Sequence, residues 1–484
     1  MRELKDPSLF ETRAYVNGVW IEGKATFPVE NPSTGDIIAH VTDMSAEDVS
    51  MAIDAAYAAK RAWAAKTGKE RSAILRKLFD LMVENADDLA TILTMEMGKP
   101  WAEARGEILY GASYIEWFAE EAKRVYGDLI PGAQADKRMV IIKQPVGVVG
   151  AITPWNFPNA MLARKMAPAL AVGCTMVARP SEFTPLSAIA LAVLAERAGV
   201  PAGVFNVLPG LDASGMGAEL CANTKVAKIT FTGSTRVGKI LMRQGAETIK
   251  KLSMELGGNA PFIVFDDADI DAAVEGAMLA KFRNNGQTCV CANRIYVQAG
   301  VYDAFAEKLS AALGALSLGD GFAEGVNTGP LINAAAVAKV EDHIADAVAK
   351  GAEVVIGGTR SNLGRTFFEP TLIKGVTQQM KVATEETFGP LAPLVKFDTE
   401  DEAVSFANAS EFGLAGYFYT RDLNRAWRVG EALETGMVGI NTGVISTEMA
   451  PFGGVKQSGM GREGSKYGCD DYLEIKNLCF GGLS

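Results

Sequence analysis

Short apolar runs alternate with helix-like segments from residue 147 onward, and this alternation most constrains the fold. Gly173 follows one helical pattern, and Gly199 with Pro201 follows the next, as expected where helices end. Strands alternating with helices build parallel βαβ units, so the pattern predicts a doubly wound α/β sheet. The expected strands are residues 148–152, 175–178, 204–208 and 227–231, and the expected helices are 161–170 and 186–197.

The same alternation returns later in the chain, at residues 262–265 and 294–297. A chain of 484 residues exceeds the usual size of one domain, so we expect a second α/β domain. Gly257 and Gly258 interrupt the pattern and mark a plausible boundary. Residues 46–93 are typical of helices, and Ser45 with Asp48 resembles a capping box at the start of the first one.

Charge and composition exclude several classes of function. Lys and Arg number 47 against 58 Asp and Glu, and this net charge of −11 argues against nucleic-acid binding. The start has no signal core and no run approaches ~18 apolar residues, so we expect no membrane span and a cytoplasmic location. The six cysteines form no regular framework, as in reducing compartments. Two histidines, His40 and His343, argue against a metal site but leave a Cys-His hydrolase open.

Two glycine-rich runs are candidates for a dinucleotide site. Residues 459–464 spell GxGxxG, but no convincing strand precedes them and only twenty residues follow, so we interpret them as a loop near a domain junction. Residues 231–238 follow an apolar run and open a helical stretch. Gly233 lets the backbone approach a phosphate at the helix N-terminus, although an ordinary strand-to-helix turn is the alternative.

A cysteine and two carboxylates are candidates for chemistry. Cys289 follows the polar, glycine-containing run 284–288, which suits a nucleophile better than a core residue. Glu255 and Glu386 each lie beside a glycine-rich turn. For either carboxylate alone, a place on the surface is the alternative.

Together these pieces resemble the aldehyde dehydrogenase superfamily. The resemblance rests on six motifs in order along nearly the whole chain: Thr153-Pro154-Trp155-Asn156-Phe157-Pro158, Phe231-Thr232-Gly233-Ser234, Glu255-Leu256-Gly257-Gly258, Gly286-Gln287-Thr288-Cys289, Glu386-Thr387-Phe388-Gly389-Pro390 and Pro451-Phe452-Gly453-Gly454. It implies a variant Rossmann cofactor domain, an α/β catalytic domain and a small β oligomerisation element that builds a homodimer or homotetramer. The ranges would be 1–122 with 146–257, then 258–464, and 123–145 with 465–484.

The resemblance also implies a mechanism. The thiolate of Cys289 would attack the aldehyde carbon, and the Asn156 amide with the Cys289 backbone N–H would stabilise the oxyanion. Hydride would pass to a nicotinamide and leave a thioester. Glu255 would then activate water as a general base, which favours a free acid as product over transfer to coenzyme A.

The cofactor implied is NAD, with NADP possible. Glu182 would accept the ribose hydroxyls and repel a 2′-phosphate, whereas Arg179 replaces the family's usual Lys and would offset part of that repulsion. Glu386 would hold the nicotinamide ribose. The full set of implied cofactor-binding residues is Thr153, Trp155, Arg179, Ser181, Glu182, Gly233, Ser234, Glu386 and Phe388.

The tail at 461–468 and the run 289–291 resemble the succinate-semialdehyde dehydrogenase subfamily. That resemblance implies that Arg164, Arg283 and Ser446 bind the distal carboxylate, since guanidinium groups pair with carboxylates. Arginines at the surface or at a domain interface are the alternative. Glutarate semialdehyde and other carboxylate-bearing aldehydes stay open, because one methylene is worth only ~1–3 kcal/mol of discrimination.

Three further hypotheses accompany this interpretation. A reversible Cys289–Cys291 disulfide would remove the nucleophile, and Cys291→Ala would then abolish recovery by dithiothreitol after mild peroxide treatment. A cysteine hydrolase would need His40 or His343 and no nicotinamide. A non-catalytic binding protein that kept the fold would tolerate Cys289→Ala.

Overall fold

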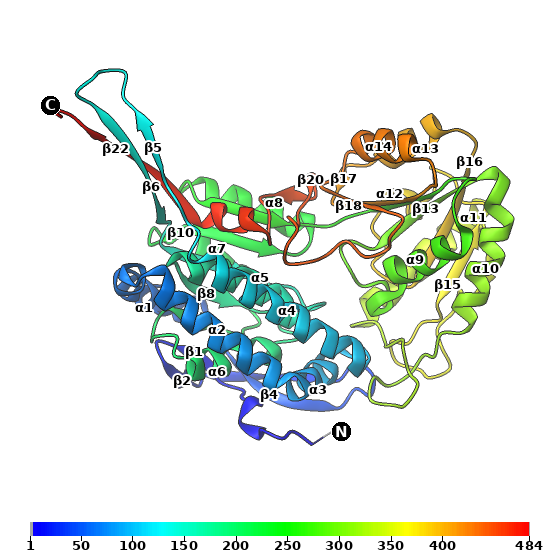
Figure 1. Ribbon diagram of the computed structural model, residues 1–484. Coiled ribbons are helices and arrows are strands. Elements are labelled where there is room, and N and C mark those ends of the chain that lie inside the picture. The colour runs from blue at the N-terminus through cyan, green and yellow to red at the C-terminus, as the bar shows by residue number, and fades with distance from the viewer. Residues whose placement is uncertain (1–2, 484) are drawn as a thin grey trace.

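Two α/β sheets lie side by side in the computed structural model, which describes residues 3–483 (Figure 1). The first has eight strands in the order β2-β1-β9-β8-β7-β10-β11-β21, and the second has seven in the order β14-β15-β16-β13-β12-β18-β19. The parallel centre of the first sheet comprises β9 (Phe205–Val207), β8 (Thr175–Arg179), β7 (Val148–Ile152), β10 (Val226–Thr232) and β11 (Lys251–Glu255).

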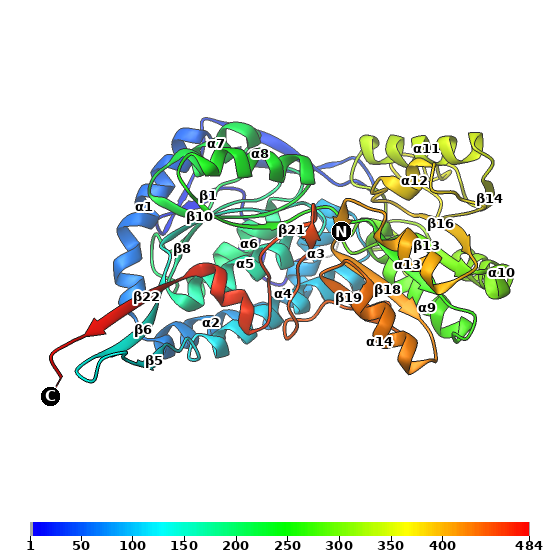
Figure 2. The same ribbon diagram turned by 90° about the horizontal axis from the view of Figure 1, so that it is seen from above.

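The first sheet is doubly wound, as predicted. Its central strands are almost entirely buried, because helices cover both faces of a parallel sheet and demand continuous apolar runs. Figure 2 shows helices on both sides of this sheet. One side carries α5 (Pro158–Val172) and α6 (Leu186–Ala198), and the other carries α7 (Ala213–Ala222) and α8 (Thr235–Ala246).

The residues that the sequence predicts at the ends of helices are also confirmed. Gly173 ends α5 in the left-handed region at φ 102°, and Gly199 ends α6 at φ 91°. Ser45 and Asp48 form the capping box of α1 (Ala46–Ala65). Three more helices follow: α2 (Gly68–Glu84), α3 (Ala86–Met97) and α4 (Trp101–Glu121). The sequence pattern did not predict the short strands before them, which are β1 (Ala14–Val16), β2 (Val19–Ile21), β3 (Ala25–Glu30) and β4 (Ile37–Asp43).

The second sheet confirms the second α/β unit. Its strands are β14 (Glu353–Ile356), β15 (Thr371–Lys374), β16 (Leu391–Phe397), β13 (Ala292–Gln298), β12 (Ala260–Val264), β18 (Ala415–Tyr419) and β19 (Met437–Ile440). Its helices are α9 (Ile270–Phe282), α10 (Tyr302–Gly314), α11 (Ala334–Ala349), α12 (Lys381–Thr384), α13 (Glu400–Asn408) and α14 (Leu423–Ala432).

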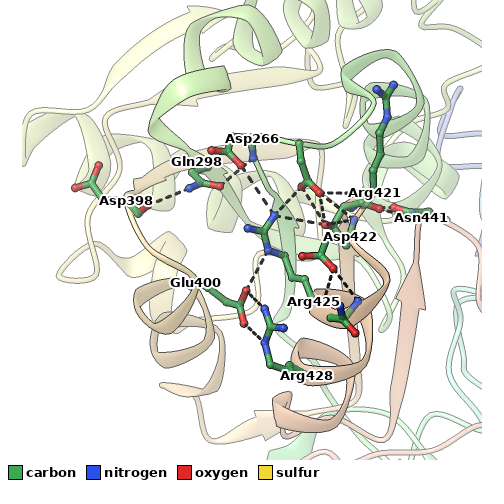
Figure 3. Close-up of polar contacts among 12 residues, drawn as sticks. Asp266, Gln298, Asp398, Glu400, Arg421, Asp422, Arg425, Arg428 and Asn441 are labelled. Atoms are coloured by element: carbon green, nitrogen blue, oxygen red, sulfur yellow. Dashed lines mark hydrogen bonds and ion pairs between the residues drawn. The ribbon is translucent and has the colours of Figure 1, made fainter.

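Paired charges hold two of these helices at the strand ends (Figure 3). Arg425 on α14 donates to Asp267, which follows β12, at 2.7 Å. It also donates to Glu400 on α13 at 3.0 Å, and Glu400 accepts from Arg428 at 2.9 Å. The charged side chains at this end of the sheet therefore neutralise one another. The opposite ends of β12 and β13 face the first sheet, since Gly257, just before β12, donates to Thr235 at the start of α8.

A third sheet projects from the body (Figure 1). It consists of β22 (Leu473–Phe480), β6 (Arg138–Pro145) and β5 (Asp128–Pro131), within the ranges expected to join subunits. The strand β21 (Gly459–Met460) lies inside the range expected for the catalytic domain but pairs with β11 of the first sheet. The division into three domains stays a prediction. Among residues 3–483, no helix has both the length and the hydropathy to cross a membrane.

Candidate active site

A cavity opens at the switch point of the first sheet. From β7 the chain runs outward through β8 to β9, and β10 then lies on the other side of β7. A crevice forms where the connections that leave two neighbouring parallel strands run to opposite sides of the sheet. Ligands of open α/β sheets bind in this crevice. The loop after β7 carries Asn156, and the loop after β10 carries Gly233 and Ser234. The cavity holds about 380 Å³.

Most of the predicted site residues line this one cavity. They are Trp155, Asn156, Arg164, Gly233, Ser234, Glu255, Arg283, Cys289, Glu386, Phe388 and Ser446. The four other predicted cofactor residues, Thr153, Arg179, Ser181 and Glu182, are not among its lining residues. Thr153 follows β7, Arg179 is the last residue of β8, and Ser181 and Glu182 follow β8. Thr153 donates its backbone N–H to the Arg179 carbonyl at 3.2 Å.

The loop before Cys289 turns through three residues in the left-handed region. Asn284, Asn285 and Gly286 have φ values of 51°, 54° and 75°, which glycine and asparagine tolerate best. Cys289 follows this turn and lines the cavity, and its backbone N–H has no hydrogen-bond acceptor among residues 3–483. Burial raises the pKa of the Cys289 thiol to about 12, while the charges of Arg164 and Arg283 act to lower it.

The side chain of Asn156 provides a second donor beside Cys289. Its Nδ2 donates to the Gln287 carbonyl at 3.0 Å, which uses one of its two hydrogens. The other hydrogen and the Cys289 N–H are both available to a negatively charged oxygen in the cavity. Two such donors are what an oxyanion hole requires.

Glu255 ends β11 with a carboxylate that has no partner. Both of its side-chain oxygens are buried and lack a hydrogen bond within the described part of the chain. Burial, and then the negative charge of Glu463, raise the pKa of Glu255 well above its usual value. A Cβ on Gly453, whose φ is 155°, would lie 3.0 Å from Glu255 Oε1, so glycine keeps this space open. An unbonded buried carboxylate beside open space suits a base that activates water.

A buried ion cluster lies behind Glu255. Glu463 forms an ion pair with Arg164 at 2.8 Å and accepts a hydrogen bond from Lys165, and all three side chains are at most 4% exposed. Arg164 also lies 3.9 Å from the centre of the Phe452 ring. Arg164 was predicted to bind substrate, and it does line the cavity, but it already has a carboxylate partner. Arg283 differs, because it makes no hydrogen bond or ion pair with residues 3–483 and faces the same cavity.

The other part of the cavity suits a nucleotide. Ser234 caps α8, whose N-terminus can face a phosphate, and a Cβ on Gly233 would clash with the Phe231 ring. Glu386 accepts from the Gly258 N–H at 3.0 Å, and burial raises the pKa of Glu386 to about 7. The rings of Trp155 and Phe388 meet edge to face at 5.6 Å. These residues fit a nicotinamide cofactor.

Several functional candidates carried no signal in the sequence. Glu463 lies inside the tail 461–468 and Lys165 inside the expected helix 161–170, but nothing in either stretch marks a buried charge. Lys339 on α11 also lines the cavity and follows no pattern that a single sequence reveals.

The two histidines and Cys291 do not line the cavity with Cys289. His343 is buried between Thr387 and Glu385, and His40 is exposed on β4. No Cys-His pair forms at Cys289, which disfavours the hydrolase hypothesis. Cys291 donates its thiol to the Lys281 carbonyl at 3.3 Å, and both thiols are free. The disulfide hypothesis stays a prediction.

A thiol, two possible oxyanion donors and an unbonded carboxylate around one cavity are the groups that covalent catalysis through cysteine requires. Residues 20–478 match the model of the aldehyde dehydrogenase family. The chain belongs to this family.

The chain is similar to named relatives over its full length. A glutarate-semialdehyde dehydrogenase of Pseudomonas aeruginosa is 62% identical over 99% of this chain and 100% of the relative. A succinate-semialdehyde dehydrogenase [NADP(+)] of Escherichia coli is 61% identical over 99% of this chain and 100% of the relative. The crystal structure of a succinate-semialdehyde dehydrogenase from Burkholderia pseudomallei matches with a TM-score of 0.98 and 61% identity, covering 99% of this chain and 100% of that one.

Proposed function

We propose that this enzyme oxidises an aldehyde with a distal carboxylate to the free acid, with succinate semialdehyde as its first candidate substrate. The observation that carries the proposal is the position of Arg283. Its guanidinium makes no hydrogen bond or ion pair with residues 3–483, lies 5.3 Å from the centre of the Phe157 ring, and shares the cavity with Cys289 and Ser446. A guanidinium without an ionic partner is a strong site for a carboxylate.

The proposed reaction begins at the sulfur of Cys289. Its proton passes to solvent water, the sulfur bonds to the aldehyde carbon, and the former carbonyl oxygen becomes an oxyanion held by the Asn156 amide and the Cys289 N–H. A nicotinamide held beside Glu386 and Phe388 would supply the acceptor for the hydride of that carbon. The oxyanion collapses to the carbonyl of a thioester. Water then attacks it while Glu255 takes the water's proton, and the carbon–sulfur bond breaks to release the acid and the thiol.

Glutarate semialdehyde is the second candidate. A relative with 62% identity carries that substrate in its name, and the relative from E. coli with 61% identity carries succinate semialdehyde. Both aldehydes present the same carboxylate to Arg283 and Ser446. They differ by one methylene, so we expect overlapping activity within roughly 10- to 200-fold.

Replacing Arg283 with glutamine tests the carboxylate site. We expect Arg283→Gln to lower kcat/KM for succinate semialdehyde by about 10- to 100-fold, the worth of a charge-assisted hydrogen bond. Oxidation of butanal, which has no carboxylate, should change little and serves as the control for any effect on Cys289. Equal losses for the two aldehydes would show that Arg283 does not bind the substrate's carboxylate.

We propose NAD as the preferred cofactor. Supporting this, the carboxylate of Glu182 would repel the 2′-phosphate of NADP. Arg179 pairs with Glu182 at 2.8 Å and is therefore engaged rather than free to bind that phosphate. The E. coli relative is named as an NADP enzyme, so the ratio of NAD to NADP activity needs direct measurement.

Replacing Glu182 with serine tests this cofactor preference. The change removes the negative charge and frees Arg179, so we expect kcat/KM for NADP to rise relative to NAD by about 10-fold, which corresponds to ~1.4 kcal/mol. Initial rates with both cofactors at saturating aldehyde measure the ratio. An unchanged ratio would place the determinant elsewhere.

We also propose that the enzyme is a cytoplasmic homo-oligomer. All six cysteines are free, which suits a reducing compartment. The projecting sheet exposes apolar side chains on both outer strands, including Leu129 at 71% and Ile475 at 73%. An apolar sheet with free edges is suited to pairing with another subunit, and native mass measurement counts the copies.

A further inference from the structure

A buried lysine contacts the loop that carries the oxyanion donor. Lys99 lies between α3 and α4 and is 1% exposed. Its Nζ donates to Glu107 Oε2 at 2.6 Å and to the backbone carbonyl of Asn156 at 2.7 Å. The same ammonium lies 3.7 Å from the centre of the Phe157 ring. Lys99 does not line the cavity, so it acts only through its neighbours.

Its partner Glu107 holds the helix that follows Asn156. Glu107 Oε1 accepts from the backbone N–H groups of Asn159 and Ala160 at 3.0 and 3.2 Å, in the first turn of α5. The residue at the N-cap position, Phe157, gives no side-chain cap. Glu107, which lies on α4, therefore accepts the hydrogen bonds that a side chain at the N-cap of α5 would otherwise accept.

A second contact reaches the same carbonyl from the cysteine loop. Asn284 Nδ2 donates to the Asn156 carbonyl at 3.1 Å, and the Asn284 backbone N–H donates to Glu103 at 2.9 Å. Glu103 and Glu107 both lie on α4. The helix α4 thus ties together the two loops that provide the donors of the oxyanion hole.

We propose that Lys99, together with Glu107, is a positioning residue that fixes the Asn156 backbone so that its amide points at the oxyanion. A buried ion pair adds little net stability compared with apolar side chains of the same volume, so its geometry is its main contribution. The inference rests on the Cys289 chemistry of the proposed function and is independent of which aldehyde is the substrate.

The test is a cycle of variants that keeps the helix cap. Lys99→Met with Glu107→Gln removes both charges, while the glutamine oxygen can still accept from α5. We expect kcat for succinate semialdehyde and for butanal to fall by about 10- to 100-fold, as for a misplaced catalytic group. In an Asn156→Ala background the same pair of changes should cost less than about 2-fold, because the group being positioned is already absent.

The matched control is Arg71→Met. Arg71 is also a buried cation that donates to a backbone carbonyl of α5, that of Ala171, but at the other end of the helix. We expect it to lower the melting temperature without changing kcat. If the Lys99/Glu107 variant does not fold, Asn284→Gly removes the second donor to the same carbonyl, keeps the left-handed backbone and should lower kcat in the same direction.

Two results would overturn the positioning role. In one, the Lys99/Glu107 changes lower kcat as much in the Asn156→Ala background as in the wild-type background. In the other, the Lys99/Glu107 variant keeps the wild-type kcat. These outcomes differ from failure of the proposed substrate. In that case the wild-type enzyme would oxidise butanal as well as the semialdehyde, and the cycle could still be read with butanal.

Discussion

Replacement of Glu255 by glutamine should leave an enzyme that completes one round of cofactor reduction and then stalls. The variant keeps Cys289 and both oxyanion donors, so the thioester forms. It lacks the base that activates water, and we expect steady-state turnover to fall by about 10²- to 10⁴-fold. Rapid mixing should show a burst of about one reduced nicotinamide per active site, followed by a slow phase.

The raised pKa of Glu255 sets the direction in which the hydrolysis rate of the wild-type enzyme changes with pH. Burial and the charge of Glu463 raise the pKa of Glu255, so its basic form grows only as the pH rises through that raised value. Hydrolysis of the thioester should therefore speed up with pH. In Glu255→Gln this dependence should disappear from the slow phase.

An exposed glutamate provides the control for this experiment. Glu431 on α14 is exposed and does not line the cavity, so Glu431→Gln should behave like the wild type. Multiple rapid turnovers by Glu255→Gln, with no burst, would assign the base to another group.

Replacement of Cys289 by alanine should abolish aldehyde oxidation altogether. The sulfur is the atom that bonds to the substrate, and loss of a nucleophile costs on the order of 10⁴-fold or more. Binding of the nicotinamide cofactor should persist, because Glu386, Phe388 and Ser234 are unchanged. Cofactor titration by fluorescence and initial rates on the same preparation measure both properties.

Another cysteine supplies the matched control. Cys479 is exposed on β22, outside the cavity, so Cys479→Ala should keep full activity. Aldehyde oxidation that survives Cys289→Ala would refute covalent catalysis at this position. A physiological role that survives while oxidation is lost would instead favour the binding-protein hypothesis.

The strands and helices that could be predicted are those with a local sequence pattern. Buried parallel strands need continuous apolar runs, and α5 and α6 end at glycines, so these elements can be located from the sequence. The short strands β1 to β4 follow no such run. β3, for example, alternates exposed and buried residues around a proline and pairs only with β4.

Glu255 and Cys289, two of the residues proposed for catalysis, could be singled out beside glycine-rich runs, whereas the buried charges could not. Residue 258 must be glycine because a Cβ there would clash with the Cys289 carbonyl. The glycine in the motif therefore reflects the close approach of the backbone at 258 to Cys289. Lys165 and Glu463 are 298 residues apart in the sequence, so no local pattern can predict that they pair. For the same reason Arg164 could be assigned to the cavity, but its partner Glu463 could not.

The most direct test compares two aldehydes with the wild-type enzyme. Initial rates with succinate semialdehyde and with butanal, each with NAD and with NADP, give four values of kcat/KM. A cavity in which Arg283 binds a distal carboxylate predicts a preference of at least about 10-fold for the semialdehyde with either cofactor, and higher values with NAD. Butanal oxidised as efficiently as the semialdehyde would contradict the carboxylate site and leave an aldehyde dehydrogenase of another specificity.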